Sequence, residues 1–182
     1  MKLLGLFRHA KSDWHDAKAR DFDRGLNARG RKGAALMGKH IVEHGMKWEQ
    51  IIASPAVRVA ETIELAAKAA GREVPVIWDR RIYLASSVIL TEVLHDLPDS
   101  VNKAMMVGHN PGLEDLIFDL VPDDGTCPLR AKVEDKFPTA AYAVLECDID
   151  SWTDLHDGCA KLVYLMRPRD LDPELGPEPA DW

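Results

Sequence analysis

An Arg-His pair follows the first apolar run of the chain and is the first place where the residue types could do chemistry. Leu3–Phe7 is apolar, and Arg8 and His9 come directly after it. A buried strand of this kind delivers a cation and a nitrogen nucleophile to the edge of a sheet, where open α/β sheets bind their ligands. The pair alone is weak evidence, because a histidine at the end of a strand is often only a hydrogen-bonded structural residue.

Two other apolar runs end in polar residues of the same kinds. Ile51–Ala53 is followed by Ser54–Arg58, and Ala104–Val107 is followed by Gly108–Pro111. Because parallel strands share one carboxyl edge, the loops that follow them converge there. No cysteine or group of carboxylates that would hold a metal lies close to these residues in the sequence. The side chains that this edge would bring together are Arg8, His9, Arg58 and His109.

This set of side chains is suited to a phosphoryl group. Arginine grips phosphate oxygens with paired hydrogen bonds, and helices predicted to begin at Pro55 and Pro111 would point backbone amides at an anion. Neighbouring guanidinium groups disfavour a further positive charge, so a histidine there stays neutral and nucleophilic. Such a nitrogen can accept the phosphoryl group and divide its transfer into two steps, while the cations stabilise charge on the equatorial oxygens.

The elements that must position these residues alternate between strand and helix. With 182 residues, 46% of them hydrophobic and 29% charged, the chain is expected to form one globular domain. Asn27 and Ser54 are expected to cap the first two helices, and residues 122–138 are expected to be a loop. The alternation predicts an α/β three-layer sandwich with a central, mostly parallel sheet and helices on both faces. The predicted strands are Lys2–Phe7, Ile51–Ala53, Val74–Trp78, Ala104–Val107, Ala140–Cys147 and Ala160–Met166, the last two paired as a hairpin, and the predicted helices span residues 28–44, 56–70, 87–97 and 113–120.

Charge and cysteine usage narrow the class of protein. Five of the seven net negative charges lie in residues 170–182, which hold no Lys or Arg. We therefore predict a single domain over residues 1–169 and a mobile, acidic, Pro-rich tail over 170–182. No basic run with interleaved aromatics indicates nucleic acid binding. The first apolar run ends at Arg8, too early for a signal peptide or a membrane span, and three cysteines without a CxxC pair indicate reduced thiols and a cytoplasmic location.

The joint order of the motifs resembles the histidine phosphatase superfamily, which has the phosphoglycerate-mutase-like fold, and most of all its SixA-type phosphohistidine phosphatases. This resemblance implies that His9 is the phosphorylated nucleophile and that Arg8, Arg58 and His109 hold the phosphoryl group. Ser12 lies where the family often has Ser or Thr, and His15 lies near a phosphate-contacting Asn of mutase relatives, although it is also typical of a solvated loop residue. The matching stretches are Leu6–Trp14, Asp23–Leu26 leading to Arg29-Gly30, Ile52–Pro55 with Arg58 and Thr62, and Val107–Pro111.

Two departures from the family pattern bear on the chemistry. Ala10 replaces the usual Gly, a change that the SixA-type branch accepts. Mutase-like relatives supply a Glu as proton donor after the third strand, whereas the segment Asp79–Tyr83 contains none. Asp79 could be the proton donor, but it is more typical of an ion-pair partner for Arg80 or Arg81. A phosphoramidate leaving nitrogen carries its own protonation and needs less help than an alkoxide, which favours phosphohistidine as substrate.

The predicted function is hydrolysis of a phosphoryl group through a phosphohistidine intermediate on His9. The expected partner is a phosphorylated protein, such as a histidine-containing phosphotransfer domain, and neither nucleic acid nor membrane. The alternatives are a phosphatase of small phosphorylated metabolites and a non-catalytic phosphate-binding or phosphohistidine-binding module. No metal or organic cofactor is implied. His40 and His44, four residues apart, are more typical of a polar helix face than of a metal site.

Overall fold

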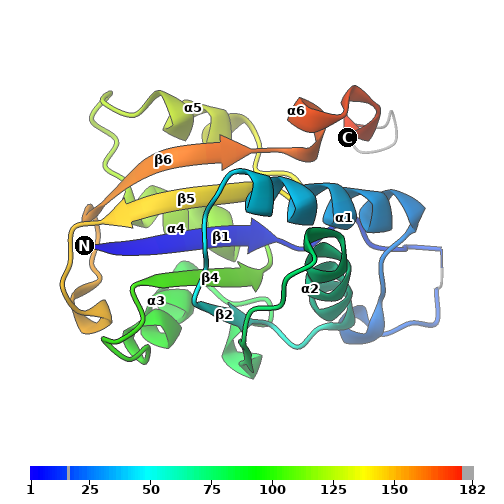
Figure 1. Cartoon of the computed structure of the whole chain (residues 1–182), viewed down its shortest axis with the longest axis horizontal. Coiled ribbons are helices and arrows are strands. Elements are labelled where there is room, and N and C mark those ends of the chain that lie inside the picture. The colour runs from blue at the N-terminus through cyan, green and yellow to red at the C-terminus, as the bar shows by residue number, and fades with distance from the viewer. Residues whose placement is uncertain (16, 178–182) are drawn as a thin grey trace.

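A six-stranded sheet forms the centre of the molecule. The computed structural model describes residues 1–15 and 17–177, and its strands lie in the order β3-β2-β4-β1-β5-β6 (Figure 1). β3, β2, β4 and β1 run parallel, whereas β5 is antiparallel to β1 and β6 is antiparallel to β5. The mostly parallel sheet and the closing hairpin are thus confirmed. The strand bounds are β1 Lys2–Arg8, β2 Gln50–Ala53, β3 Val76–Trp78, β4 Lys103–Gly108, β5 Tyr142–Cys147 and β6 Ala160–Met166.

Helices cover both faces of the sheet, and each face has its own apolar core. Two helices, α1 and α2, pack on the face that buries Phe7, and three, α3, α4 and α5, pack on the face that buries Leu6. β1 serves both cores because successive side chains of a strand point to opposite faces. The predicted three-layer sandwich is therefore confirmed. The helix bounds are α1 Ala28–Glu43, α2 Val57–Ala70, α3 Ser87–His95, α4 Gly112–Leu120, α5 Pro128–Asp135 and the short α6 Pro168–Leu171.

The predicted N-cap residue is correct for α1 but not for α2. The Asn27 side chain accepts a hydrogen bond from the Gly30 backbone N–H at 2.8 Å, so the predicted cap of α1 is confirmed. A Cβ atom at Gly30 would lie 1.9 Å from the Lys11 carbonyl oxygen, so glycine lets α1 approach the loop after β1. The predicted Ser54 cap of α2 is wrong: Ala56 is the N-cap residue, and the Ser54 hydroxyl is used elsewhere.

Residues 122–138 contain helix α5, so the expectation of a continuous loop there was wrong. Pro128 occupies the first turn of this helix, a position that proline tolerates because its missing N–H is not needed there. Only Val133 of the helix is fully buried. An apolar stripe of one residue leaves little helical periodicity to recognise in the sequence.

The end of the described chain packs against the start of α1. The Lys32 ammonium group lies 3.0 Å from the Asp172 carboxylate and 3.5 Å from that of Glu174, and Arg29 donates to the Gly176 carbonyl oxygen at 2.6 Å. Residues 170–177 of the expected tail make these contacts, and residues 178–182 lie outside the described residues. Within the described chain, no helix is both long and apolar enough to cross a membrane.

Candidate active site

The carboxyl edge of the parallel strands brings the four predicted side chains together. β1 pairs in register with β4, so that Arg8 lies opposite Gly108 and the His9 backbone N–H donates to the Gly108 carbonyl oxygen at 3.1 Å. The ring centres of His9 and His109 are 5.4 Å apart, and a terminal nitrogen of Arg58, from the first turn of α2, lies 3.3 Å from His109 Nδ1. The four side chains line a pocket of about 390 Å³.

His9 is held in the form that a nucleophile requires. Its Nδ1 donates to the Ala10 carbonyl oxygen at 2.7 Å, so Nε2 carries the lone pair. Burial of the ring, together with the neighbouring cations, lowers the pKa of His9 well below 6.5 and keeps the ring neutral. Thr62 fixes the backbone beneath it, because its hydroxyl oxygen accepts from Ala10 N–H at 2.9 Å and donates to the Arg58 carbonyl oxygen at 2.7 Å.

Arg58 is buried and Arg8 is half-buried, and both line the pocket. Arg8 donates through one terminal nitrogen to the Phe137 carbonyl oxygen at 3.1 Å. The Nε atoms of Arg8 and Arg58 are buried and have no hydrogen-bond partner within the described part of the chain. Burial lowers the pKa of Arg8 to about 10, which still leaves it positively charged at neutral pH. Buried donors of this kind are costly unless a ligand accepts from them.

His109 is neutral, and its tautomer follows from its neighbours. Burial and the charge of Arg58 lower the pKa of His109 to about 3. A guanidinium nitrogen can only donate, so Nδ1 accepts from Arg58, and Nε2 donates to the Ser54 hydroxyl oxygen at 2.8 Å. The same hydroxyl oxygen accepts from the Ala56 backbone N–H at 3.3 Å. Ser54 therefore orients His109 instead of capping α2.

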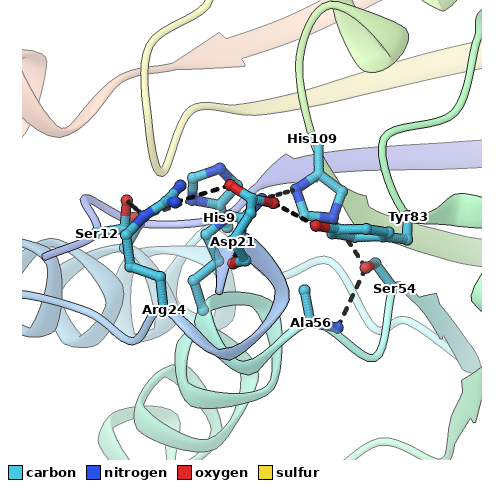
Figure 2. Close-up of polar contacts among 10 residues, drawn as sticks. His9, Ser12, Asp21, Arg24, Ser54, Ala56, Tyr83 and His109 are labelled. Carbon is cyan, nitrogen blue, oxygen red and sulfur yellow. Dashed lines mark hydrogen bonds and ion pairs between the residues drawn. The ribbon is translucent and has the colours of Figure 1, made fainter. Parts of the chain in front are cut away.

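Asp21 is a pocket residue whose part in the site was not predicted from the sequence. Its carboxylate accepts from Arg58 at 3.1 Å, from Arg24 at 2.7 Å and from the Tyr83 hydroxyl group. Figure 2 shows this carboxylate between Arg24 on one side and Tyr83 and His109 on the other, with His9 beside it. Partial burial opposes ionisation, but the bonds from Tyr83 and Arg24 and the charge of Arg58 hold the pKa of Asp21 well below its usual range.

The remaining predicted site residues divide between the pocket and its surroundings. Ser12 is buried in the pocket wall, where its hydroxyl oxygen accepts from Arg24 Nε at 3.0 Å. His15 is exposed and does not belong to the pocket lining. Asp79 also lies outside the lining. It caps the 3₁₀ turn Arg80–Ile82 and pairs with Arg81 at 2.7 Å, so the expected ion pair is confirmed.

His40 and His44, at the end of α1, both contact Tyr164. His40 Nε2 lies 2.5 Å from the Tyr164 hydroxyl oxygen, and the ring of His44 stacks on that of Tyr164 with centres 3.8 Å apart. Across the described residues, no group of three or more His, Cys, Asp or Glu side chains is arranged to hold a metal ion.

The charge of the pocket contrasts with that of the chain. The chain has a net charge of −7, yet the described lining contains seven Lys or Arg side chains and a single carboxylate, that of Asp21. One wall is the end of the described chain, from Pro168 to Pro177. The pocket can therefore concentrate an anion beside the neutral His9. The seven cations are Arg8, Lys11, Arg24, Arg29, Arg58, Lys136 and Arg169.

Comparisons with known proteins show what the chain is similar to. The model of the histidine phosphatase superfamily (branch 1) matches residues 4–82. An uncharacterized protein of Mycobacterium tuberculosis is 32% identical over 163 residues, which cover 89% of this chain and 99% of that protein. The crystal structure of the proposed phosphohistidine phosphatase SixA of Agrobacterium tumefaciens superimposes with a TM-score of 0.77 at 27% identity, covering 92% of this chain and 98% of the other. The protein histidine phosphatase SixA complexed with tungstate shares the fold, with a TM-score of 0.75 at 18% identity and coverages of 93% and 99%.

Proposed function

This chain belongs to the histidine phosphatase superfamily, and we propose that it hydrolyses a phosphoryl group through a phosphohistidine intermediate on His9. The observation that carries the proposal is the hydrogen bond from His9 Nδ1 to the Ala10 carbonyl oxygen. It leaves the lone pair on Nε2 of a buried, neutral ring. Arg8 and Arg58 lie beside that ring, and the Nε donor of each has no hydrogen-bond partner among the described residues.

The reaction proceeds in two displacements at phosphorus. His9 Nε2 attacks and forms an N–P bond, while the bond between phosphorus and the leaving group breaks and the leaving group takes the electron pair. Arg8 and Arg58 stabilise the charge on the equatorial oxygens, and His109 lies against Arg58 on the same side of the pocket. Water then attacks phosphorus, the N–P bond breaks, and phosphate leaves with His9 restored.

The proposed substrate is a phosphohistidine carried by a protein, such as a histidine-containing phosphotransfer domain. The likeness to the proposed SixA phosphohistidine phosphatase of Agrobacterium tumefaciens supports this choice. A second support is that Asp79, the residue considered as a proton donor, is paired with Arg81 outside the pocket. An imidazole leaving group takes up a proton on its own second nitrogen and depends less on an enzymic acid.

We also propose that the protein works in the cytoplasm. Cys127, Cys147 and Cys159 are all free thiols, and Cys147 and Cys159 are buried. Thiols persist in this form in a reducing compartment. The proposed partner fits such a location, because phosphorylated signalling domains and phosphorylated metabolites both meet a cytoplasmic enzyme directly.

Incubation with labelled acetyl phosphate tests the nucleophile. We expect the wild-type protein to acquire an acid-labile label and His9→Ala to acquire none. His15→Ala is the matched control, because His15 is exposed and lies outside the pocket lining. Equal labelling of wild type and His9→Ala would refute the assignment of His9.

A substrate panel tests the second part of the proposal. A histidine-containing phosphotransfer domain, phosphorylated with phosphoramidate, is compared with a set of small phosphomonoesters. We expect the highest kcat/KM with the phosphorylated protein. Faster turnover of a small ester would leave the nucleophile in place and identify a phosphatase of small metabolites. Binding of the phosphoprotein without release of phosphate would identify a non-catalytic module.

A further inference from the structure

Two large apolar side chains stand at the mouth of the pocket with most of their surface in water. Trp14, on the loop after β1, is 71% exposed, and Leu84, on the loop after the 3₁₀ turn Arg80–Ile82, is 56% exposed. Both line the pocket that contains His9. The Trp14 ring stacks on the Arg24 guanidinium group, and Leu84 follows Tyr83, whose hydroxyl group donates to Asp21. Both apolar side chains are therefore available to a substrate that extends out of the pocket.

Trp14 is held in place without being buried. The Arg24 guanidinium carbon lies 3.6 Å from the centre of the Trp14 ring. Arg24 is itself fixed by Asp21 at 2.7 Å and by Ser12 at 3.0 Å. A ring positioned in this way loses little conformational freedom when another surface covers it, which favours binding. Exposed, rigid tryptophans are typical anchors of protein interfaces.

Leu84 occupies a backbone conformation that glycine adopts freely and leucine does not. Its φ is +49°, in the left-handed region that a Cβ atom disfavours. The chain nevertheless keeps a leucine at this position and exposes its side chain, so neither local geometry nor core packing accounts for the residue. Residues held in such conformations concentrate at functional sites.

The charge around the two residues indicates the chemistry of the surface they would meet. Seven Lys or Arg side chains and one carboxylate line the described pocket, in a chain with a net charge of −7. The cations alone would serve a small phosphorylated metabolite. An apolar pair at the mouth has a use only if the substrate extends beyond the pocket with an apolar surface of its own. A partner with acidic residues around the phosphorylated side chain would complement the basic lining.

We propose that Trp14 and Leu84 form a docking rim for a folded protein that presents its phosphorylated side chain among apolar and acidic residues. This rests on the proposed function, and it adds a contact surface outside the phosphoryl pocket. The rim holds the protein while the phosphoryl group enters between Arg8 and Arg58. It therefore contributes to KM for a protein substrate and little to KM for a small one.

Two substrates and three variants test the rim. Leu84→Gly removes the side chain at a conformation that suits glycine, so its thermal midpoint should equal or exceed that of the wild type. Trp14→Ala removes the other side chain of the rim. Trp78→Ala is the matched control, because Trp78 is an exposed tryptophan on the outer strand β3 and does not line this pocket. The substrates are a phosphoramidate-phosphorylated phosphotransfer domain and the free amino acid N-phosphohistidine.

We expect Leu84→Gly and Trp14→Ala each to lose at least ten times more kcat/KM with the phosphorylated domain than with free phosphohistidine, through an increase in KM. Trp78→Ala should match the wild type with both. Equal losses on the two substrates, or no loss, would overturn the rim and leave the role of His9 untouched. Absence of the acid-labile label on wild-type His9 would instead overturn the proposed function.

Discussion

The carboxylate of Asp21 occupies donors that a bound phosphoryl group needs, so its neutralisation should strengthen anion binding. One terminal nitrogen of Arg58 donates to the Asp21 backbone oxygen at 2.7 Å and the other to its carboxylate at 3.1 Å. An incoming oxyanion that uses the Arg58 terminal nitrogen bonded to the carboxylate must displace this carboxylate. Asp21→Asn keeps the shape and can still accept from Arg24 at Oδ1, whereas its NH₂ group replaces the oxygen that now accepts from Arg58 and Tyr83, so the competing charge is removed.

The magnitude follows from the exposure of the two partners. The Arg58 side chain is 2% exposed, whereas that of Asp21 is 42% exposed. Fully exposed pairs contribute about 0.2–1 kcal/mol, and hydrogen bonds to charged groups about 1.5–3 kcal/mol. A half-exposed carboxylate on a buried arginine falls between these ranges, at about 1–2 kcal/mol. We therefore expect Asp21→Asn to lower the Kd for an oxyanion by about 5- to 30-fold.

Calorimetric titration with tungstate at low ionic strength measures this difference. Asp23→Asn is the control, because Asp23 lies in the same 3₁₀ turn and its carboxylate pairs with Arg20 at 3.8 Å. It should bind tungstate as the wild type does. If Asp21→Asn keeps its thermal midpoint but binds tungstate no more tightly, the competition argument fails. Asp21 would then serve to position Arg58.

Four further predictions concern single residues around the pocket. The unfolded chain binds a proton at His109 near pH 6.5 but the folded chain only near pH 3, so stability should fall as the pH drops through this window, and urea unfolding of His109→Gln should show a flatter pH dependence. Ser54→Ala leaves the buried His109 N–H without an acceptor and should lower the free energy of unfolding by about 1–3 kcal/mol and reduce kcat. Lys32→Glu should speed proteolytic removal of residues 168–177, because the new carboxylate would repel those of Asp172 and Glu174, which the Lys32 ammonium group now binds. Asp79→Asn should leave kcat for phosphomonoesters unchanged, and a tenfold loss would establish Asp79 as the proton donor.

The convergence of His9, Arg58 and His109 could be predicted because a parallel sheet dictates it. Each residue follows an apolar run, and the carboxyl ends of neighbouring parallel strands meet at one edge. The observed order places β1 beside β4 and β4 beside β2, so the three loops are adjacent. The prediction required only the ends of the three apolar runs, and polar residues mark those ends clearly.

The contacts of Asp21 and Ser54 could not be predicted in the same way. Asp21 reaches Arg58 and Tyr83 from a loop without periodicity, and no spacing rule links these positions. Ser54 followed by Pro55 is typical of a helix cap, yet its hydroxyl oxygen accepts from His109. A hydroxyl group beside a buried imidazole N–H is needed there, because an unpaired buried donor is costly. The need to pair the buried His109 N–H therefore outweighs the local preference of Ser54 for capping the helix.

The carboxylates in and around the pocket bear on which leaving group the proposed reaction can use. Asp21 is held ionised by Tyr83, Arg24 and Arg58, and Asp79 is paired with Arg81. Burial raises the pKa of Glu114, but this residue does not line the described pocket. An alkoxide leaving group needs a proton from such an acid, whereas the imidazole of a phosphohistidine can be protonated on its second nitrogen before the P–N bond breaks. The arrangement of these carboxylates therefore bears more on how fast the protein hydrolyses N-phosphoryl substrates relative to O-phosphoryl substrates than on the absolute rate with either.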